Sequence, residues 1–158
     1  MTETIKLLIV DDEVEFLTTI SERLEQRGFD VVMESESEKA LNIAQREKFD
    51  LALLDLQMPG MSGTELLDAL KQEHKFLEVI ILTGYGSVES AFECSKLGAF
   101  GYLAKPFDLD KLLPLLQEAF TARMQKKFEH NRVVADKISE LAVGSSPLSI
   151  LRAMKELD

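Results

Sequence analysis

Short apolar runs alternate along the chain with segments in which apolar residues recur every three or four positions. The runs have the length of β-strands, whereas the spaced pattern is typical of amphipathic helices. Five strands are predicted on this basis: Ile5–Val10, Val31–Met33, Leu51–Leu54, Val79–Leu82 and Phe100–Ala104. Strands that are apolar throughout and separated by helices indicate a parallel sheet covered on both faces. The predicted fold class is therefore α/β, an open doubly wound sheet with right-handed crossovers.

The helical segments between the strands carry end signals. Gly28 stands where the first helix needs a residue that accepts a left-handed conformation, which predicts a C-cap there. Ser35 with Glu38, and Ser62 with Glu65, have the spacing of capping boxes and predict the starts of two further helices. His74 and His130 are expected to be solvated helix residues, since neither belongs to a pattern that requires a partner.

The last helical pattern begins near Asp108 and continues into a tail of different character. Pro114 lies inside this pattern and lacks a backbone N–H, so a kink or a restart of the helix is expected. In the tail, positions 124, 128, 131, 135, 138 and 142 follow coiled-coil steps of four and three. We therefore predict a domain at residues 1–122 and a helical extension at 123–158. Its stripe either binds a partner or packs back on its own domain.

Polar side chains stand at the points where four of the predicted strands end. They are Asp11 and Asp12 after the first strand, Asp55 after the third, Thr83 after the fourth and Lys105 after the fifth. The carboxyl ends of parallel strands meet at one edge of a sheet, which is where doubly wound folds bind their ligands. The sequence therefore predicts a single site that contains all five side chains.

The three carboxylates of this set suit a magnesium ion, which prefers hard oxygen ligands. We predict Asp11, Asp12 and Asp55 as ligands, with a backbone carbonyl near Gln57 as a further one. At least one of three crowded acids should resist ionisation unless a cation is present.

A carboxylate is also a competent nucleophile towards phosphorus and would yield an aspartyl phosphate. The oxygens of the transferred group need compensating charge and hydrogen-bond donors, which the ammonium of Lys105 and the hydroxyl of Thr83 can supply. Gly84 leaves room for this group beside Thr83.

The composition of the chain excludes several classes of function. The 158-residue chain has a net charge of −10, which argues against direct binding to nucleic acid. Its single cysteine, Cys94, excludes a disulfide within the chain, suits the cytoplasm and is expected to be a small buried hydrophobe. No charged-then-apolar leader opens the sequence, and no apolar run approaches the roughly 18 residues that span a membrane.

The motifs together resemble those of a bacterial two-component response regulator, in its CheY-like receiver domain. The likeness is carried by residues 8–13 (LIVDDE), 55–63 (DLQMPGMSG), 81–84 (ILTG) and 98–107 (GAFGYLAKPF), in order and at family-like spacing. The resemblance implies a flavodoxin-like sheet with strand order 2-1-3-4-5. It also implies a phosphoacceptor switch that is not an enzyme and works with Mg²⁺, and a cis Pro106.

The resemblance further implies roles for single residues. Asp55 would accept a phosphoryl group from a sensor histidine kinase or a phosphotransfer protein, with Mg²⁺ held by Asp11 or Asp12 and Asp55. Thr83 and Tyr102 would move on activation and remodel the face formed by the fourth helix, the fifth strand and the fifth helix. That face would then control assembly, for example a homodimer, or an output partner.

Simpler interpretations exist for each residue. Asp12 could be a helix N-cap, Asp55 a turn former, Thr83 a β-branched strand residue and Lys105 a solvated charge. Tyr102 could be ordinary strand packing with an exposed hydroxyl. Only the combination of these residues favours a site.

Other functions compete with the switch. A Mg²⁺-dependent phosphatase with an aspartate nucleophile usually needs an acid–base Asp two residues after it, where this chain has Gln57. A Rossmann nucleotide-binding domain needs a glycine-rich turn where Asp11 and Asp12 stand. Residues 143–147 (VGSSP) resemble the start of the ATPase module of transcription activators, so the chain could be part of such a protein or a complete single-domain regulator.

Overall fold

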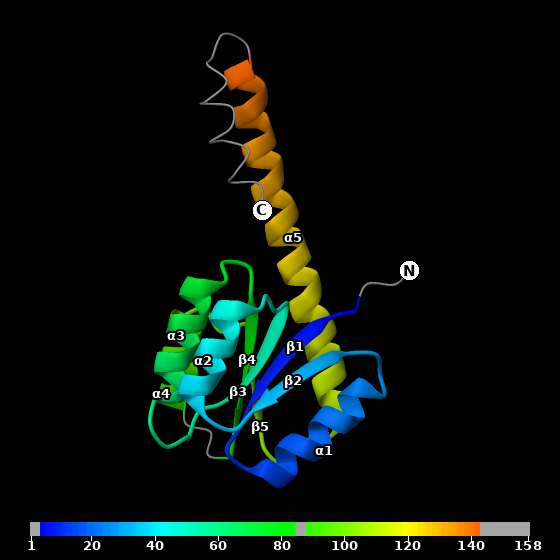
Figure 1. Cartoon of the computed structure of the whole chain (residues 1–158), viewed down its shortest axis with the longest axis vertical. Helices are drawn as coiled ribbons and strands as arrows, with labels where there is room; N and C mark the ends of the chain where they lie inside the picture. Colours follow the sequence, from blue (N-terminus) through cyan, green and yellow to red (C-terminus); the bar gives the residue numbers. More distant parts are fainter. Residues whose placement is uncertain (1–3, 85–87, 143–158) are drawn as a thin grey trace. The chain divides into compact units, whose positions relative to one another are not determined.

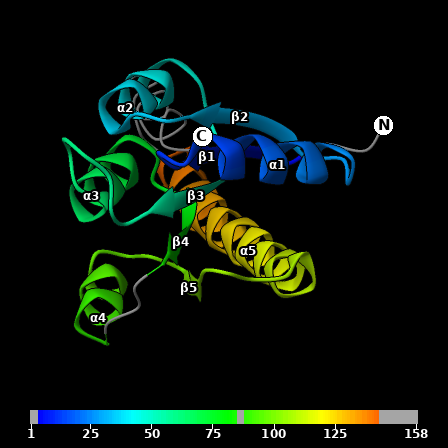
Figure 2. The same cartoon turned by 90° about the horizontal axis from the view of Figure 1, so that it is seen from below.

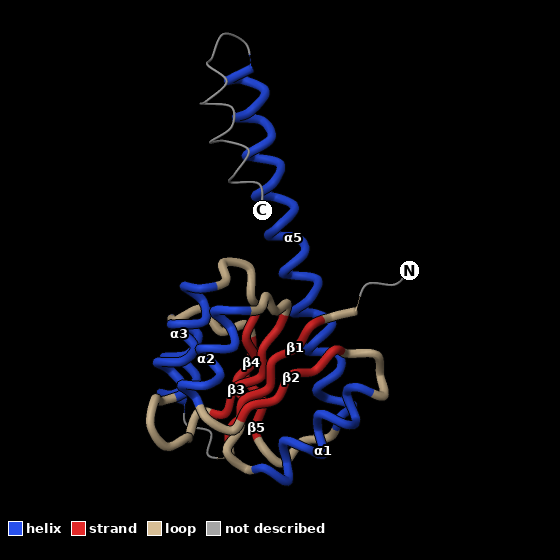
Figure 3. Tube along the Cα trace, viewed as in Figure 1, coloured by secondary structure: helices blue, strands red, loops and turns tan. Residues whose placement is uncertain are grey.

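The computed structural model describes residues 4–84 and 88–142 of the 158-residue chain. Strands and helices alternate throughout (Figure 1). In chain order they are β1 (Lys6–Val10), α1 (Val14–Glu25), β2 (Asp30–Glu34), α2 (Ser37–Arg46), β3 (Leu51–Asp55), α3 (Gly63–Glu73), β4 (Glu78–Thr83), α4 (Val88–Lys96), β5 (Gly101–Ala104) and α5 (Leu109–Ala142). The strands form one parallel sheet in the order β2-β1-β3-β4-β5, with β3 in its centre (Figure 3). The predicted fold class and strand order are confirmed.

Helices cover both faces of the sheet (Figure 2). Successive side chains of a strand point to opposite faces, so Leu8 and Val10 of β1 lie in the core beneath α2, α3 and α4. Leu7 and Ile9 lie in the core beneath α1 and α5, together with Leu112, Leu116 and Ala119 of α5. These four of the five β1 residues are fully buried, which explains why residues 7–10 show no alternation of polar and apolar side chains.

Strand register fixes the positions of the acidic residues. Val10 of β1 pairs with Leu54 of β3, so the next residues, Asp11 and Asp55, emerge side by side at the carboxyl edge of the sheet. Asp55 is itself the last residue of β3 and pairs with Leu82 of β4. The strand was expected to end at Leu54; it is longer because the pairing with β4 continues for one more residue.

The predicted caps have different outcomes. Ser62 is the N-cap of α3 and accepts a hydrogen bond from the Glu65 backbone N–H at 3.2 Å, as its spacing indicated. The capping box expected at Ser35 is wrong, because α2 begins at Ser37 and its N-cap has no side-chain bond. The Glu34 carboxylate accepts the N–H groups of Ser35 and its neighbour instead, at 2.8 and 3.0 Å.

Gly28 follows α1 with a φ of +94°, and the N–H of Phe29 donates to the Leu24 carbonyl at 3.2 Å. This conformation is one that side-chain-bearing residues rarely adopt. The predicted C-terminal glycine signal is confirmed.

Two further expectations concern single side chains. His74 is not simply solvated: its ring is half-buried, and its Nε2–H donates to the Ala44 carbonyl at 2.5 Å, which joins the end of α3 to α2. His130 is half-buried as well. Cys94 is 1% exposed and packs in the core, as expected, and burial raises the pKa of its thiol.

α5 is one helix from Leu109 to Ala142 and continues through Pro114, so the expected restart does not occur. Burial of Leu112 and Leu116 on either side of Pro114 supplies packing that offsets the missing hydrogen bond. The kink stays a prediction.

The chain forms two compact units, residues 1–120 and 121–158. In the described part of the second unit, Met124 and Phe128 of the predicted stripe are 47% and 70% exposed. The boundary at residue 122 stays a prediction, and residues 143–147 lie outside the described part of the chain. No helix among the described residues is long and apolar enough to cross a bilayer.

Candidate functional site

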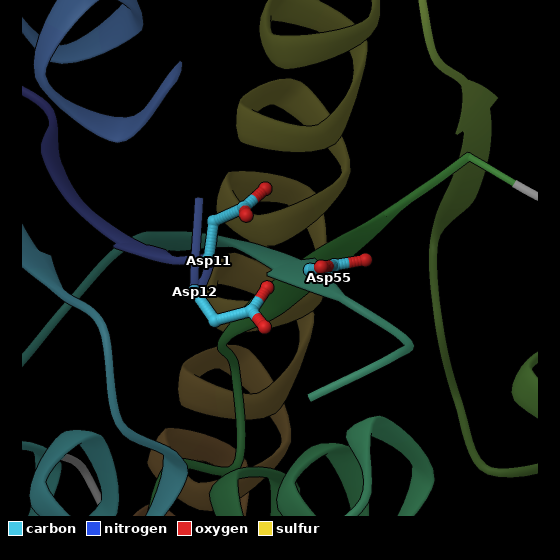
Figure 4. A group of neighbouring side chains, drawn as sticks. All are labelled: Asp11, Asp12 and Asp55. Carbon is cyan, nitrogen blue, oxygen red and sulfur yellow. The ribbon is translucent and has the colours of Figure 1, made fainter. Parts of the chain in front are cut away.

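Three carboxylates gather at the carboxyl edge of the sheet. Asp11 and Asp12 follow β1, Asp55 ends β3, and one carboxylate oxygen from each lies within 4.8 Å of the others (Figure 4). Asp11 and Asp55 are 0% and 5% exposed, whereas Asp12 faces solvent. Two buried acids and one accessible acid provide the oxygen ligands and the open side that a hard, partly hydrated cation requires. The donor set therefore fits a divalent cation such as Mg²⁺.

Asp11 is held from two directions. Its Oδ1 accepts the backbone N–H of Glu13 at 2.9 Å, and its Oδ2 forms an ion pair with Lys105. Burial raises the pKa of Asp11, although the bonds to Lys105 and Glu13 act in the opposite direction. The N-cap of α1 is Glu13, without a side-chain cap bond, so the interpretation of Asp12 as an N-cap is wrong.

Lys105 belongs to the site and is not a solvated charge. Its side chain is only 12% exposed, and its Nζ also lies 3.6 Å from the Glu13 carboxylate. Burial alone would lower the pKa of Lys105, but the hydrogen bond and charge of Asp11, with the charges of Asp55 and Glu13, raise it. Lys105 is therefore a fixed positive charge at the rim of the acidic cluster. The peptide bond to Pro106 is cis, as the resemblance implied.

Asp55 has less hydrogen-bond support than Asp11. The Gln57 backbone N–H donates a long hydrogen bond, 3.4 Å, to Oδ1 of Asp55. Burial, and then the negative charge of Asp11, raise the pKa of Asp55 from its ordinary value of 3.8 to about 6, while Lys105 partly offsets this. Without a cation, ionisation of Asp55 is thus opposed, as the crowding of three acids indicated. The structure places the N–H of Gln57 here; ligation by its carbonyl stays a prediction.

The two proposed switch residues lie on neighbouring strands. Thr83 ends β4 fully buried, and its carbonyl accepts the Lys105 backbone N–H at 2.7 Å. Tyr102 pairs with Ile81 and packs against the core beneath α2, α3 and α4. Its hydroxyl is buried and has no hydrogen-bond partner among the described residues, so the alternative of an exposed hydroxyl is wrong.

Gly63 supports the loop after Asp55, a role that the sequence analysis did not assign. A Cβ at this position would lie 2.6 Å from the Leu56 Cα and 2.8 Å from the Asp55 carbonyl oxygen. Both atoms belong to the backbone and cannot move aside cheaply. The β3–α3 loop can therefore fold back on the end of β3 only if residue 63 lacks a side chain.

We predict that Gly63→Ala lowers the free energy of unfolding by about 1–3 kcal/mol, because the added methyl group forces the backbone apart. Urea denaturation followed by circular dichroism measures this. Gly84→Ala is the matched control, since a Cβ there meets nothing within 4 Å. Equal stability of the two variants would contradict the prediction.

The sheet order and the acidic cluster with its lysine define a class of protein, the receiver domain. The response regulator receiver domain family matches residues 7–117, and the chain belongs to this family. A receiver domain is a phosphoacceptor switch of two-component signalling, so the resemblance stated from the motifs is confirmed.

Individual relatives share this assignment. Sporulation initiation phosphotransferase F of Bacillus subtilis is 37% identical over 107 residues, which cover 68% of this chain and 86% of that protein. The transcriptional regulatory protein ZraR of Escherichia coli K12 is 34% identical over 145 residues, covering 92% of this chain but only 32% of that protein. The chain thus spans about a third of the length of this regulator.

Among solved structures, a CheY-like response regulator receiver domain protein from Methanospirillum hungatei has a TM-score of 0.76 and 31% identity. The match covers 78% of this chain and 99% of that one.

Proposed function

We propose that Asp55 accepts a phosphoryl group from a phosphohistidine of a sensor kinase or phosphotransfer protein. The observation that carries this proposal is the placement of Asp55, nearly buried at the end of β3, beside two further carboxylates and the ammonium of Lys105. An Asp55 oxygen forms a bond to phosphorus while the phosphorus–nitrogen bond breaks, and the electron pair leaves with the imidazole. The chain itself acts as a switch and not as an enzyme on other substrates.

Each neighbour of Asp55 has a distinct part in this proposal. Asp11, Asp12 and Asp55 would hold Mg²⁺, with the carbonyl of Gln57 as a further ligand; the bound ion neutralises charge on the carboxylates and on the phosphoryl oxygens. Lys105 and Thr83 would each contact one phosphoryl oxygen.

The switch itself would begin at Thr83. Its hydroxyl would move inward toward the phosphoryl group, and the Tyr102 side chain would change rotamer with it. The hydroxyl of Tyr102 is buried and has no hydrogen-bond partner in the part of the chain that the structure describes. This supports the role, because an unsatisfied polar group favours an alternative rotamer in which it is paired.

For output, we propose that the remodelled face of α4, β5 and α5 controls assembly or a partner. The exposed Met124 and Phe128 support pairing of the extension with a second copy of the chain. We further propose a transcription-activator ATPase module as the element under control; the name of ZraR, a transcriptional regulatory protein, supports a role in regulating transcription. The net charge of −10 supports a chain that does not bind nucleic acid directly. We place the protein in the cytoplasm, away from membranes.

A small phosphodonor such as phosphoramidate tests the site. We expect intact-mass measurements to show one added phosphoryl group that depends on Mg²⁺. Asp12→Asn should raise the Mg²⁺ concentration needed by at least about tenfold, because it removes a metal ligand. Isothermal titration calorimetry measures the same loss as weaker Mg²⁺ binding. Asp30→Asn, an exposed acid at the opposite edge of the sheet, is the control. Uptake that is independent of Mg²⁺ would contradict the proposed metal role.

A further inference from the structure

The aromatic ring of Phe16 lies against the ammonium of Lys105. The Lys105 Nζ is 4.3 Å from the centre of the ring, inside the range in which a cation is attracted to an aromatic face. The charge is also largely shielded from water, since the Lys105 side chain is only 12% exposed. A contact of this kind is stronger in a desolvated setting than on an open surface.

Phe16 is itself held in place by the segment that carries Lys105. Its ring contacts Phe107 edge to face, with centres 5.9 Å apart and planes at 84°. Phe107 follows Lys105 and Pro106 directly. One side chain of α1 thus contacts both ends of the Lys105–Phe107 segment, which fixes the ring relative to the lysine.

Lys105 has room to move on this side. A groove of about 470 Å³ runs beside it, lined by residues that include Glu13, Phe16, Thr19, Arg23, Lys105 and Phe107. A lysine has a flexible four-carbon stem. The Lys105 ammonium pairs with Asp11 and lies 3.6 Å from the Glu13 carboxylate, but among the described residues no ion pair joins it to Asp55. Without the Phe16 ring, the ammonium could turn into this groove and away from the acidic cluster.

We propose that Phe16 is a positioning residue for phosphoryl transfer, whose ring holds the Lys105 ammonium at the rim of the Asp55 site. The inference rests on the proposed phosphorylation of Asp55. Phe16 touches neither Asp55 nor the metal ligands in any described contact; it acts through Lys105, by limiting the positions that the ammonium samples before the phosphoryl group arrives.

Rates of phosphoryl uptake from phosphoramidate, followed by intact mass, test the proposal. Phe16→Leu keeps an apolar side chain but removes the ring, and we expect uptake to slow by about three- to tenfold. Phe16→Tyr should restore most of the rate. Site-specific fluorinated phenylalanines at position 16 should slow uptake in order of fluorine number, because fluorine weakens the charge on the ring face with little change in shape. A packing role alone would give no such order.

The contact itself is measured separately, in unphosphorylated protein. The lysine ε-methylene signals of Lys105, assigned by their absence in Lys105→Arg, should be shifted upfield by the ring. We expect this shift to be lost in Phe16→Leu and kept in Phe16→Tyr. Phe76→Leu is the matched control: Phe76 also lies near a lysine, with Lys75 Nζ 5.6 Å from its ring, but precedes β4 at the opposite edge of the sheet.

The outcomes separate the two proposals. If wild type takes up no phosphoryl group, the proposed function is wrong, whatever the Lys105 signal shows. If wild type takes it up and Phe16→Leu does so equally fast, or if fluorination has no graded effect, Phe16 does not position Lys105. An unchanged Lys105 signal in Phe16→Leu would also overturn the inference.

Discussion

Asp55→Asn is expected to take up no phosphoryl group under conditions in which wild type is fully modified. An amide oxygen is a far poorer nucleophile than a carboxylate oxygen, and asparagine has nearly the same shape as aspartate, so the fold should persist. Intact mass after incubation with phosphoramidate and Mg²⁺ measures the result. Asp68→Asn, an exposed acid on α3, is the matched control and should be modified like wild type.

The same samples show what phosphorylation controls. A change in solution mass by light scattering that occurs in wild type and not in Asp55→Asn would identify assembly as the output. A verified modification without a mass change would indicate a partner-binding switch of fixed oligomeric state. Modification of Asp55→Asn at the wild-type rate would show that another residue is the acceptor, and the proposed role of Asp55 would be wrong.

The fold could be predicted because the interior strands β1, β3 and β4 are buried on both sides and almost wholly apolar. Leu7 and Leu8 both read as core residues, and only a strand buried between two helical layers has no polar face. The exact end of a strand could not be predicted from the sequence, because it depends on pairing with the next strand: pairing with β4 extends β3 by one residue, to Asp55. The Ser35 capping box is wrong because α2 begins later, at Ser37, and the Glu34 carboxylate accepts the backbone N–H groups of Ser35 and Glu36.

The acidic cluster could also be predicted, since Asp11, Asp12 and Asp55 follow directly from strand ends that meet. The residues that support it could not. Phe16 lies at a position of α1 that reads as ordinary helix packing, and its contact with Lys105 joins segments 89 residues apart, the difference between positions 105 and 16. The hydrogen bond from His74 to Ala44 likewise depends on how two helices pack, which no local pattern encodes.

The metal-free protein should become less stable as the pH rises from about 4 to about 6. The folded state raises the pKa of Asp55 from 3.8 to about 6, so between these values it binds the proton more tightly than the unfolded chain does. The free energy of unfolding is then highest below the pKa that Asp55 has in the unfolded chain, and it falls as the pH rises past the pKa that Asp55 has in the folded protein. A shift of about two units corresponds to at most about 3 kcal/mol. Burial raises the pKa of Asp11 too, which adds a loss in the same direction.

Asp55→Asn removes this contribution, because asparagine cannot ionise; Lys105, whose pKa the Asp55 charge helps to raise, stays protonated throughout this pH range. With chelator present, we expect the excess of the variant's free energy of unfolding over that of wild type to grow by up to about 2 kcal/mol between pH 4.5 and pH 7.5. Urea titrations at both pH values measure the difference. Mg²⁺ should then stabilise wild type at pH 7.5 far more than the variant, since binding to the folded state alone raises its stability. If the difference in free energy of unfolding between variant and wild type does not change with pH, folding does not disfavour the ionised form of Asp55, and the prediction is wrong.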